Sequence, residues 1–345
     1  METQKSIRRT ITFATLFVAA VFAGRQTVIE GTQAAAVWPA AGVAVVWFSA
    51  QRHSRLWGLD AALFVAATAV LNWATGATVA ISAVFVVANC AQVATFIYLL
   101  GRWRPRLWGA GGTEGLQGPK DLWGLLGAAF LSTCAGAAIG PTGVWLMTGS
   151  YSAPSTLMWL ARNTASVLLI GAVGLCVGNA FAEYASRTGS TKGWSRYLIR
   201  RLRGISPRRL FEYTALASCS AGAYLALFAH DGQLQVTFIL IAITVWAAMR
   251  LPTAVVVVHD LAVAMTVVLF TLAGHGPFAD DIHPVTSALY AQLFAAVVAV
   301  VGLSLALTRD ERDAALAETR RQAALMNAVV DSMADGLAVI DQAGH

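Results

Sequence analysis

Long apolar stretches recur along the chain between Ile11 and Leu307, and short polar breaks separate them. A helix needs roughly 20 apolar residues to cross the hydrocarbon core of a bilayer, whereas strands of a membrane barrel alternate over about ten residues. The pattern therefore predicts an all-α membrane protein with a bundle of about ten transmembrane helices, or eight if two weak segments are re-entrant. The ten predicted spans cover residues 11–24, 34–50, 59–73, 78–100, 122–147, 157–182, 211–229, 234–249, 253–273 and 286–308.

The distribution of basic residues predicts the orientation of these spans. Lysine and arginine next to a span resist translocation, so they gather in cytoplasmic loops. Every second loop carries such residues, while the opposite loops hold only Arg25, together with Glu30, Asp231, Asp280 and Asp281. We therefore expect a multi-pass protein of the bacterial inner membrane with both termini in the cytoplasm. The basic residues on the predicted cytoplasmic side are Lys5, Arg8, Arg9, Arg52, Arg55, Arg102, Arg104, Arg106, Lys120, Arg187, Lys192, Arg196, Arg200, Arg201, Arg203, Arg208, Arg209, Arg250, Arg309 and Arg312.

The composition argues against other classes of protein. Charged residues make up 12% of the chain and apolar residues 57%, whereas soluble domains contain roughly 25% charged residues. The net charge of +6 follows from the cytoplasmic loops, so we expect no nucleic acid as a partner. The four cysteines lie singly in apolar spans, which argues against a disulfide framework or a zinc site. The outer loop 274–283 holds two histidines and two aspartates in no established ligand spacing, so we expect no metal and no cofactor.

The chain divides into four regions. Residues 1–10 form a cytoplasmic N-terminus, 11–308 the membrane body, and 309–333 a charged cytoplasmic helix. Seam positions in this helix alternate in steps of three and four, which is typical of a parallel two-stranded coiled coil and predicts a homodimer. The alternative is an amphipathic helix that lies on the membrane or against the bundle. Residues 334–345 are expected to form a helix end, one strand and a turn, which is less than a complete domain. The seam residues are Leu316, Thr319, Ala323, Met326, Val330, Met333 and Leu337.

Two polar residues inside a predicted span are candidates for sensing. His259 and Asp260 lie within the span 253–273, where an ionisable group costs roughly 2.5–3.5 kcal/mol on insertion scales and needs a partner. They either line a water-filled or ligand cavity, respond to protonation, or form a structural hydrogen-bonded pair. The sequence leaves these alternatives open.

A second candidate group lies on two other spans. Arg162 and Asn163 are near the outer end of the span 157–182, and Asn89 and Gln92 lie deeper in the span 78–100. Such groups commonly join helices through hydrogen bonds of under about 1 kcal/mol each. Alternatively, the Arg162 guanidinium binds an anionic ligand that arrives from outside, because its fork of donors matches carboxylate and phosphate geometry.

Seven short segments stand in a characteristic order along the spans. They are Trp38-Pro39-Ala40-Ala41-Gly42, Leu71-Asn72, the stretch from Asn89 to Gln92, Trp159-Leu160-Ala161-Arg162-Asn163, Trp246-Ala247-Ala248-Met249-Arg250, Gly274-His275-Gly276-Pro277-Phe278, and Gln292-Leu293-Phe294 leading to Gly302-Leu303. In this order they resemble the membrane-associated sensor family of bacteria, type I (MASE type I), over residues 11–312. The chain departs from the family pattern at Gln92 and at Arg162-Asn163, where acidic residues are expected.

The resemblance implies the input module of a signalling protein. Residues 326–341 resemble the opening of a PAS domain, which in this family joins the input module to a kinase or a cyclase. We expect a sensor histidine kinase whose catalytic part lies beyond this chain, with a response regulator as its partner and an unknown small ligand or membrane cue as its signal. A diguanylate cyclase input module and a transporter or permease are the alternatives. No phosphate-binding loop, nucleophile elbow or metalloprotease motif is present, so no catalytic residue is assigned.

Overall fold

The computed structural model describes residues 2–29, 35–228, 237–279 and 283–343. These residues form eleven helices and no strand, which confirms the prediction of an all-α membrane bundle. The helices are α1 (Glu2–Arg25), α2 (Pro39–Ala50), α3 (Trp57–Ala74), α4 (Val79–Trp103), α5 (Pro119–Thr148), α6 (Ala153–Thr188), α7 (Trp194–Arg203), α8 (Pro207–Phe228), α9 (Phe238–Arg250), α10 (Thr253–Leu272) and α11 (Pro284–Ala343).

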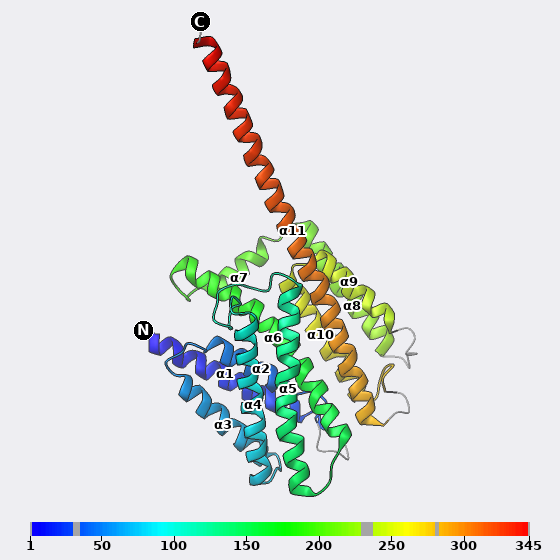
Figure 1. Cartoon of the computed structure of the whole chain (residues 1–345). Coiled ribbons are helices and arrows are strands. Elements are labelled where there is room, and N and C mark those ends of the chain that lie inside the picture. Colours follow the sequence, from blue (N-terminus) through cyan, green and yellow to red (C-terminus); the bar gives the residue numbers. More distant parts are fainter. Residues whose placement is uncertain (1, 30–34, 229–236, 280–282, 344–345) are drawn as a thin grey trace.

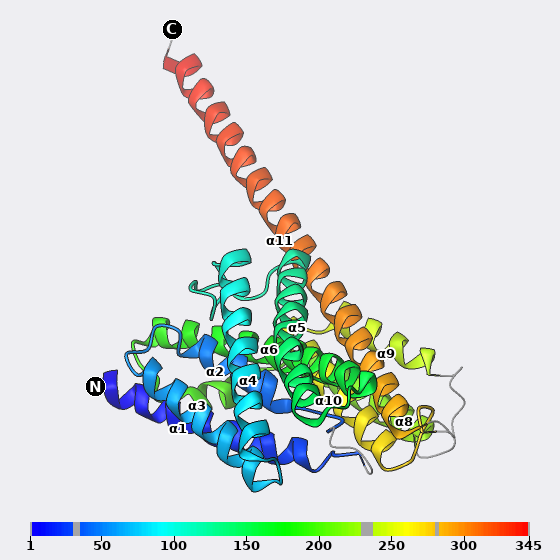
Figure 2. The same cartoon turned by 60° about the horizontal axis from the view of Figure 1, so that its bottom comes forward.

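The helices form two groups that meet along α6. Figures 1 and 2 both place α1 and α3 on one side of the bundle and α8 and α9 on the other. Helix α6 packs against α2 and α5 of the first group and against α10 and α11 of the second. A change in the first group can therefore reach α11 through a single helix.

The helix lengths agree with a polytopic protein. Seven helices are long and apolar enough to cross a bilayer, namely α1 from Ser6 onwards, α3, α4, α5, α6, α10 and α11. Helices α2 and α9 are apolar but shorter, with 12 and 13 residues. Helix α8 has 22 residues and occupies the place of another predicted span. Each predicted span thus corresponds to one helix, and the number of ten crossings stays a prediction.

The loops that carry the arginines gather at one end of the bundle. The hydroxyl oxygens of Ser6 and Ser54 are 2.5 Å apart, which joins the start of α1 to the loop between α2 and α3. A Cβ atom added at Gly118, before α5, would lie in van der Waals contact with the Glu311 carboxylate of α11. We call this the arginine-rich end and the opposite end the outer end. The assignment of the arginine-rich end to the cytoplasm rests on the sequence and stays a prediction.

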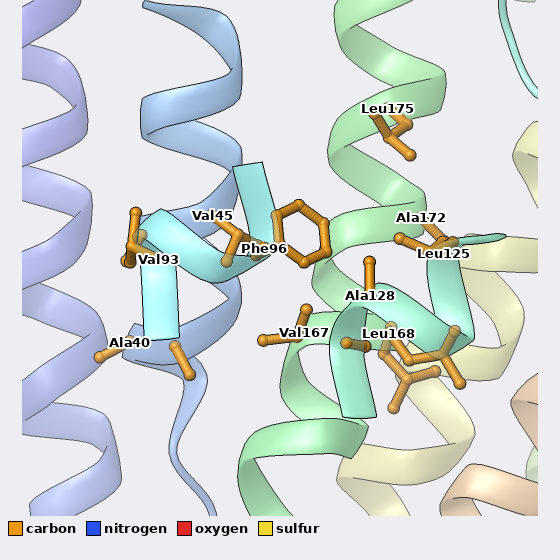
Figure 3. Packing of buried hydrophobic residues seen from close by; sticks show 14 of the residues in the cluster. Ala40, Val45, Val93, Phe96, Leu125, Ala128, Val167, Leu168, Ala172 and Leu175 are labelled. Carbon is orange, nitrogen blue, oxygen red and sulfur yellow. The ribbon is translucent and has the colours of Figure 1, made fainter. Parts of the chain in front are cut away.

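The core of the first group is made by small and branched residues on α2, α4, α5 and α6. Figure 3 shows Val45 of α2 and Phe96 of α4 facing Val167 of α6, with Leu125 of α5 close to the same helix. Leu125 and Val167 are fully buried, and Val45 and Phe96 are almost fully buried. Burying an aliphatic or aromatic side chain contributes about 1.5–3 kcal/mol in water, and inside a bilayer the same close packing contributes through dispersion.

Helix α2 is held unusually close to α6. Pro39 occupies the first turn of α2. A backbone N–H at this position has no acceptor within the helix, so proline loses no hydrogen bond there. A Cβ atom added at Gly42 would lie 2.4 Å from the Ser166 carbonyl oxygen and 2.6 Å from the Ile170 Cβ atom. Only glycine permits this approach of the two backbones, which is the role that small residues play between membrane helices.

Two elements differ from the sequence prediction. Helix α7 forms within the basic stretch that follows α6, and its Trp194 ring packs against the ring of Tyr184 at 5.4 Å. Helix α11 continues to Ala343, where one strand and a turn were predicted. A single strand has no neighbour to pair with among the described residues, whereas a helix satisfies its backbone hydrogen bonds internally. The start of a PAS domain at residues 334–345 therefore stays a prediction.

Candidate sensing site

Asn163 and Gln92 form the centre of a buried polar chain between three helices. The Asn163 Nδ2 atom of α6 donates to the Gln92 Oε1 atom of α4 at 3.0 Å. The Gln92 Nε2 atom then donates to the Thr133 hydroxyl of α5 at 3.4 Å. All three side chains are nearly fully buried. The sequence analysis expected acidic residues at both positions of the first bond, and in the structure these two residues are hydrogen-bond partners.

Arg162 lies next to this chain and is enclosed by two tryptophans. Its guanidinium carbon lies 5.3 Å from the ring centroid of Trp38 and 5.5 Å from that of Trp159. Its Nη1 atom donates to the Ala35 carbonyl oxygen at 2.6 Å, which ties α6 to the segment before α2. Cation–π contacts of this kind contribute about 0.5–1 kcal/mol when exposed and about 2 kcal/mol when desolvated. We call Trp38, Gln92, Trp159, Arg162 and Asn163 the outer cluster.

A second arginine extends the outer cluster toward α3. The Arg25 guanidinium carbon lies 5.9 Å from the Trp38 ring centroid, on a ring that Arg162 also contacts. Its Nη2 atom donates to the Asn72 Oδ1 atom at 3.1 Å. Two guanidinium groups thus share one aromatic ring at the outer end. Glu30, the carboxylate nearest to Arg25 in the sequence, lies outside the described residues.

The outer cluster is connected to the second group of helices by Gln292 of α11. The Gln292 Nε2 atom donates to the Ala36 carbonyl oxygen at 2.7 Å, and its side chain is almost fully buried. The adjacent carbonyl, that of Ala35, accepts from Arg162 of α6. Two neighbouring peptide groups therefore hold α6 and α11 together. The sequence placed Gln292 in a family segment but gave no signal that it bonds to the chain before α2.

The cavities around the outer cluster are small. Asn89 and Gln92 border a cavity of about 10 Å³ together with Trp38, which is close to the smallest volume that holds one water molecule. A second cavity, of about 40 Å³, lies between α6, α10 and α11 and is bordered by Gln292. In this conformation the polar groups of the outer cluster join helices through hydrogen bonds, which is the first of the two alternatives for Arg162 and Asn163; the second was the binding of an anionic ligand. An anionic ligand would require the segment around Trp38 to move.

His259 and Asp260 form a separate group on α10. The His259 Nδ1 atom lies 3.1 Å from the Asp260 Oδ1 atom, and its Nε2 atom lies 2.8 Å from the Ser220 hydroxyl of α8. Asp260 is almost fully buried, and a Cβ atom added at Gly302 of α11 would lie only 2.3 Å from its Oδ2 atom. Arg162 shares no hydrogen bond with this group. The pair therefore joins α8, α10 and α11 and belongs to a different part of the bundle from the outer cluster.

A buried carboxylate that the sequence analysis missed lies at the other end of the first group. Asp60, in the first turn of α3, is fully buried. Its Oδ1 atom accepts from the Thr10 hydroxyl at 2.7 Å and from the Trp47 indole nitrogen at 2.9 Å. Asp60 stands at the edge of an apolar span, where a charge is easily taken for a solvated loop residue. An acidic residue flanked directly by Leu59 and Ala61 was the available signal.

The structure gives no metal-ligand cluster among its described residues, where no three His, Cys, Asp or Glu side chains come together. Within the outer loop 274–283, Asp280 and Asp281 lie outside those residues, so the loop is not described completely.

Comparison with known proteins identifies the family of the chain. Neither the curated proteins nor the solved structures give a significant match. The family model of MASE1, the membrane-associated sensor domain, matches residues 9–313, which contain most of α1, all of α2 to α10 and the first half of α11. These limits agree closely with the resemblance over residues 11–312. The chain belongs to the MASE1 family, and it is a multi-pass, membrane-embedded sensor input domain of a signalling protein.

Proposed function

We propose that this sensor domain is the input module of a bacterial sensor histidine kinase and that α11 carries its signal to the output domain. The observation that supports this most directly is the continuity of α11, which runs without a break from Pro284 to Ala343. Figure 1 shows its second half leaving the bundle as a single rod. From Glu311 to Ser332 every residue of α11 is exposed, so the rod has no support from the bundle.

A polar joint surrounds α11 where it leaves the bundle. The Arg309 Nη1 atom donates to the carbonyl oxygens of Ala248 at 2.7 Å and of Leu251 at 2.5 Å, which lie at the end of α9. The next residue, Asp310, accepts from the Thr253 hydroxyl at the start of α10 at 2.5 Å. Any displacement of α11 relative to α9 and α10 must break or rearrange these bonds. In the proposed mechanism, loss or rearrangement of these bonds moves α11 between discrete positions, which a signal needs in order to be switched.

The exposed part of α11 carries an apolar stripe that suits a second copy of the chain. Leu316, Met326 and Val330 are 47%, 65% and 55% exposed although they are apolar. They occupy positions of the seam that predicts a parallel coiled coil. The proposed dimer would bury them and place two output domains side by side, as a kinase that phosphorylates within a dimer requires. A response regulator would then be the partner of the output domain.

The proposed signal begins at the outer cluster. Because Gln292 and Arg162 bond to adjacent peptide groups, a small ligand or membrane cue that shifts residues 35–38 acts directly on α11. Coupling of this kind is shown by its effect on an output and not by proximity alone. The experiment below therefore measures enzymatic output.

The register of α11 provides the test. Protein expressed in membranes from the complete reading frame of the gene is assayed for autophosphorylation, with inserts placed after Ala324. An insert of two residues rotates the distal helix by about 200°, whereas one of seven residues changes its phase by only about 20°. We expect the two-residue insert to abolish or lock the kinase activity and the seven-residue insert, the matched control, to preserve its regulation.

The other outcomes decide between the alternatives. Formation of cyclic di-GMP from GTP without autophosphorylation would assign a diguanylate cyclase as the output. Equal kinase activity of the two insertion variants would refute signalling through the rotational phase of α11. Solute uptake into vesicles by a chain with no output domain would favour a permease, although the membrane cavity between α6, α10 and α11, of about 40 Å³, gives that alternative little support.

A further inference from the structure

A basic pocket opens at the arginine-rich end, at the opposite end of α2 from Trp38 of the outer cluster. It has a volume of about 440 Å³, within the range of roughly 300–1,000 Å³ that is usual for small-molecule sites. It lies between the start of α1, the loop from α2 to α3, and the loop that follows α4. Arg9, Arg52, His53 and Arg55 line it, and none of its lining residues is an aspartate or glutamate. We call this the basic pocket.

The wall that carries Arg52 is fixed by contacts with other helices. The Arg52 Nη1 atom donates to the Ile97 carbonyl oxygen of α4 at 3.1 Å. A Cβ atom added at Gly101 would lie 2.7 Å from two of its guanidinium nitrogens, so the guanidinium rests directly on α4. Behind it, the fully buried amide of Gln51 donates to the Thr10 hydroxyl at 3.1 Å. A guanidinium held in this way loses little freedom when it binds an anion.

The opposite wall is a loop that folds only because it contains glycine. Gly109 and Gly111 have φ angles of +81° and +126°, which other residues adopt only with strain. A Cβ atom added at Gly112 would lie 2.0 Å from the Arg106 carbonyl oxygen. Trp108 of the same loop packs closely against Gly178 of α6. A Cβ atom added at Gly178 would lie 2.1 Å from the Trp108 ring. The loop is thus clamped against the bundle, and its backbone faces the basic pocket.

Arg9 and Arg55 of the basic pocket differ from Arg106, which lies in the loop after α4. Arg106 forms ion pairs with Glu114 and Asp121 at 2.8 Å each, and its pKa is raised chiefly by the hydrogen bond to Asp121. Among the described residues, by contrast, Arg9 and Arg55 have no ion-pair partner. The predicted topology explains why arginines lie on this side of the membrane. It does not explain why unpaired ones from two separate segments converge on one cavity.

We propose that the basic pocket binds a phosphate group, carried either by the headgroup of an anionic phospholipid or by a free phosphorylated solute. Guanidinium forks match phosphate oxygens in bidentate geometry, and several of them together neutralise its charge. The pocket lies where the predicted topology places the inner leaflet, so both sources can reach it. Occupation would link α1 to the loops that precede α3 and α5, and this gives the sensor domain a second input that is independent of the proposed kinase output.

The test compares the two sources in the full chain. The protein is reconstituted in nanodiscs of phosphatidylcholine, and its thermal unfolding midpoint is followed during titration with inorganic phosphate at constant ionic strength. A second series replaces part of the phosphatidylcholine with phosphatidylglycerol. The variant R9Q/R55Q removes two charges from the basic pocket, and the matched control R196Q/R200Q removes two exposed charges from α7 at the same end. Without phosphate or anionic lipid, all three proteins should unfold at similar temperatures.

We expect a concentration-dependent rise of the midpoint in the wild type and in the control, with at least about tenfold weaker apparent affinity in R9Q/R55Q, because charge-assisted hydrogen bonds are lost. A rise with inorganic phosphate identifies a free phosphorylated solute as the ligand class. A rise with phosphatidylglycerol alone identifies the lipid headgroup. Absence of both effects, or equal losses in R9Q/R55Q and R196Q/R200Q, would overturn the proposal.

Discussion

Replacement of Gly302 by alanine tests whether α10 and α11 pack as closely as the structure shows. The added Cβ atom would lie 2.3 Å from the Asp260 Oδ2 atom and 2.9 Å from its Cγ atom. Ordinary contacts begin near 3.4 Å, so the carboxylate or the helix must move by about 1 Å. The carboxylate is not free to turn away, because it is almost fully buried and its Oδ1 atom lies 3.1 Å from His259.

The expected magnitude follows from two opposing effects. Overpacking a well-packed interior costs about 1–3 kcal/mol, whereas alanine in place of glycine within a helix gains up to about 1 kcal/mol. We therefore expect Gly302→Ala to lower the free energy of unfolding by about 1–2 kcal/mol. Gly222→Ala is the matched control, because a Cβ atom at Gly222 of α8 has no atom within 4 Å. That substitution should leave the stability unchanged or raise it.

Unfolding in mixed micelles titrated with sodium dodecyl sulfate, followed by tryptophan fluorescence, measures both variants. The mechanism is checked in the background Asp260→Ala, where the clashing oxygen is absent and Gly302→Ala should no longer destabilise. Such a double-mutant cycle isolates the contact between the two positions. If Gly302→Ala is as stable as Gly222→Ala, or if its cost persists without the carboxylate, the close approach of α10 and α11 is refuted.

Further substitutions test three other parts of the bundle. Asn163→Leu should cost about 0.6–1.7 kcal/mol, the range measured for membrane hydrogen bonds, and a double-mutant cycle with Gln92→Leu should recover that coupling. Asp60→Ala should lower the unfolding free energy by about 1–3 kcal/mol, because it leaves the buried indole N–H of Trp47 unsatisfied, whereas Asp60→Asn should cost less; denaturant titration would show both. Arg309→Ala should leave tryptophan fluorescence native-like yet remove regulation of the output activity in the proposed full-length kinase, and a normally regulated variant would exclude the joint from signalling.

The positions of the helices could be predicted from the sequence because burial in lipid imposes a simple rule. Each span needs a long apolar stretch, and the chain supplies one between successive polar breaks. The close packing of α2 on a neighbouring helix could also be expected from the sequence. Gly42 follows Trp38-Pro39 near the start of the helix, and a small residue there permits a close approach. The basic helix α7 was not found. Its ten residues contain several arginines and no apolar stretch long enough for a span, so the hydropathy pattern indicates a cytoplasmic loop there.

The candidate site could be predicted only in part. The sequence selected Arg162, Asn163 and Gln92 because polar groups in lipid need partners, and the structure brings all three into the outer cluster. It could not show that Arg162 bonds to Ala35, because the donor and the carbonyl are 127 residues apart. Backbone acceptors carry no signal in the sequence. The same reason explains why Gln292 was missed as a connection between the two groups of helices.

The polar contacts of α11 suggest why this helix, among those of the bundle, suits the transmission of a signal. Gln292 bonds to the segment before α2 near the outer end, Gly302 rests on Asp260 in the middle, and Arg309 bonds to the end of α9. At 1.5 Å per residue the first and last of these contacts are about 26 Å apart, close to the roughly 30 Å thickness of the hydrocarbon core. If the continuous helix moves as one body over that distance, release of its outer contact has to be accommodated at the joint around Arg309. The exposed rod beyond the joint would then turn or shift with it, without any relay of small side-chain changes.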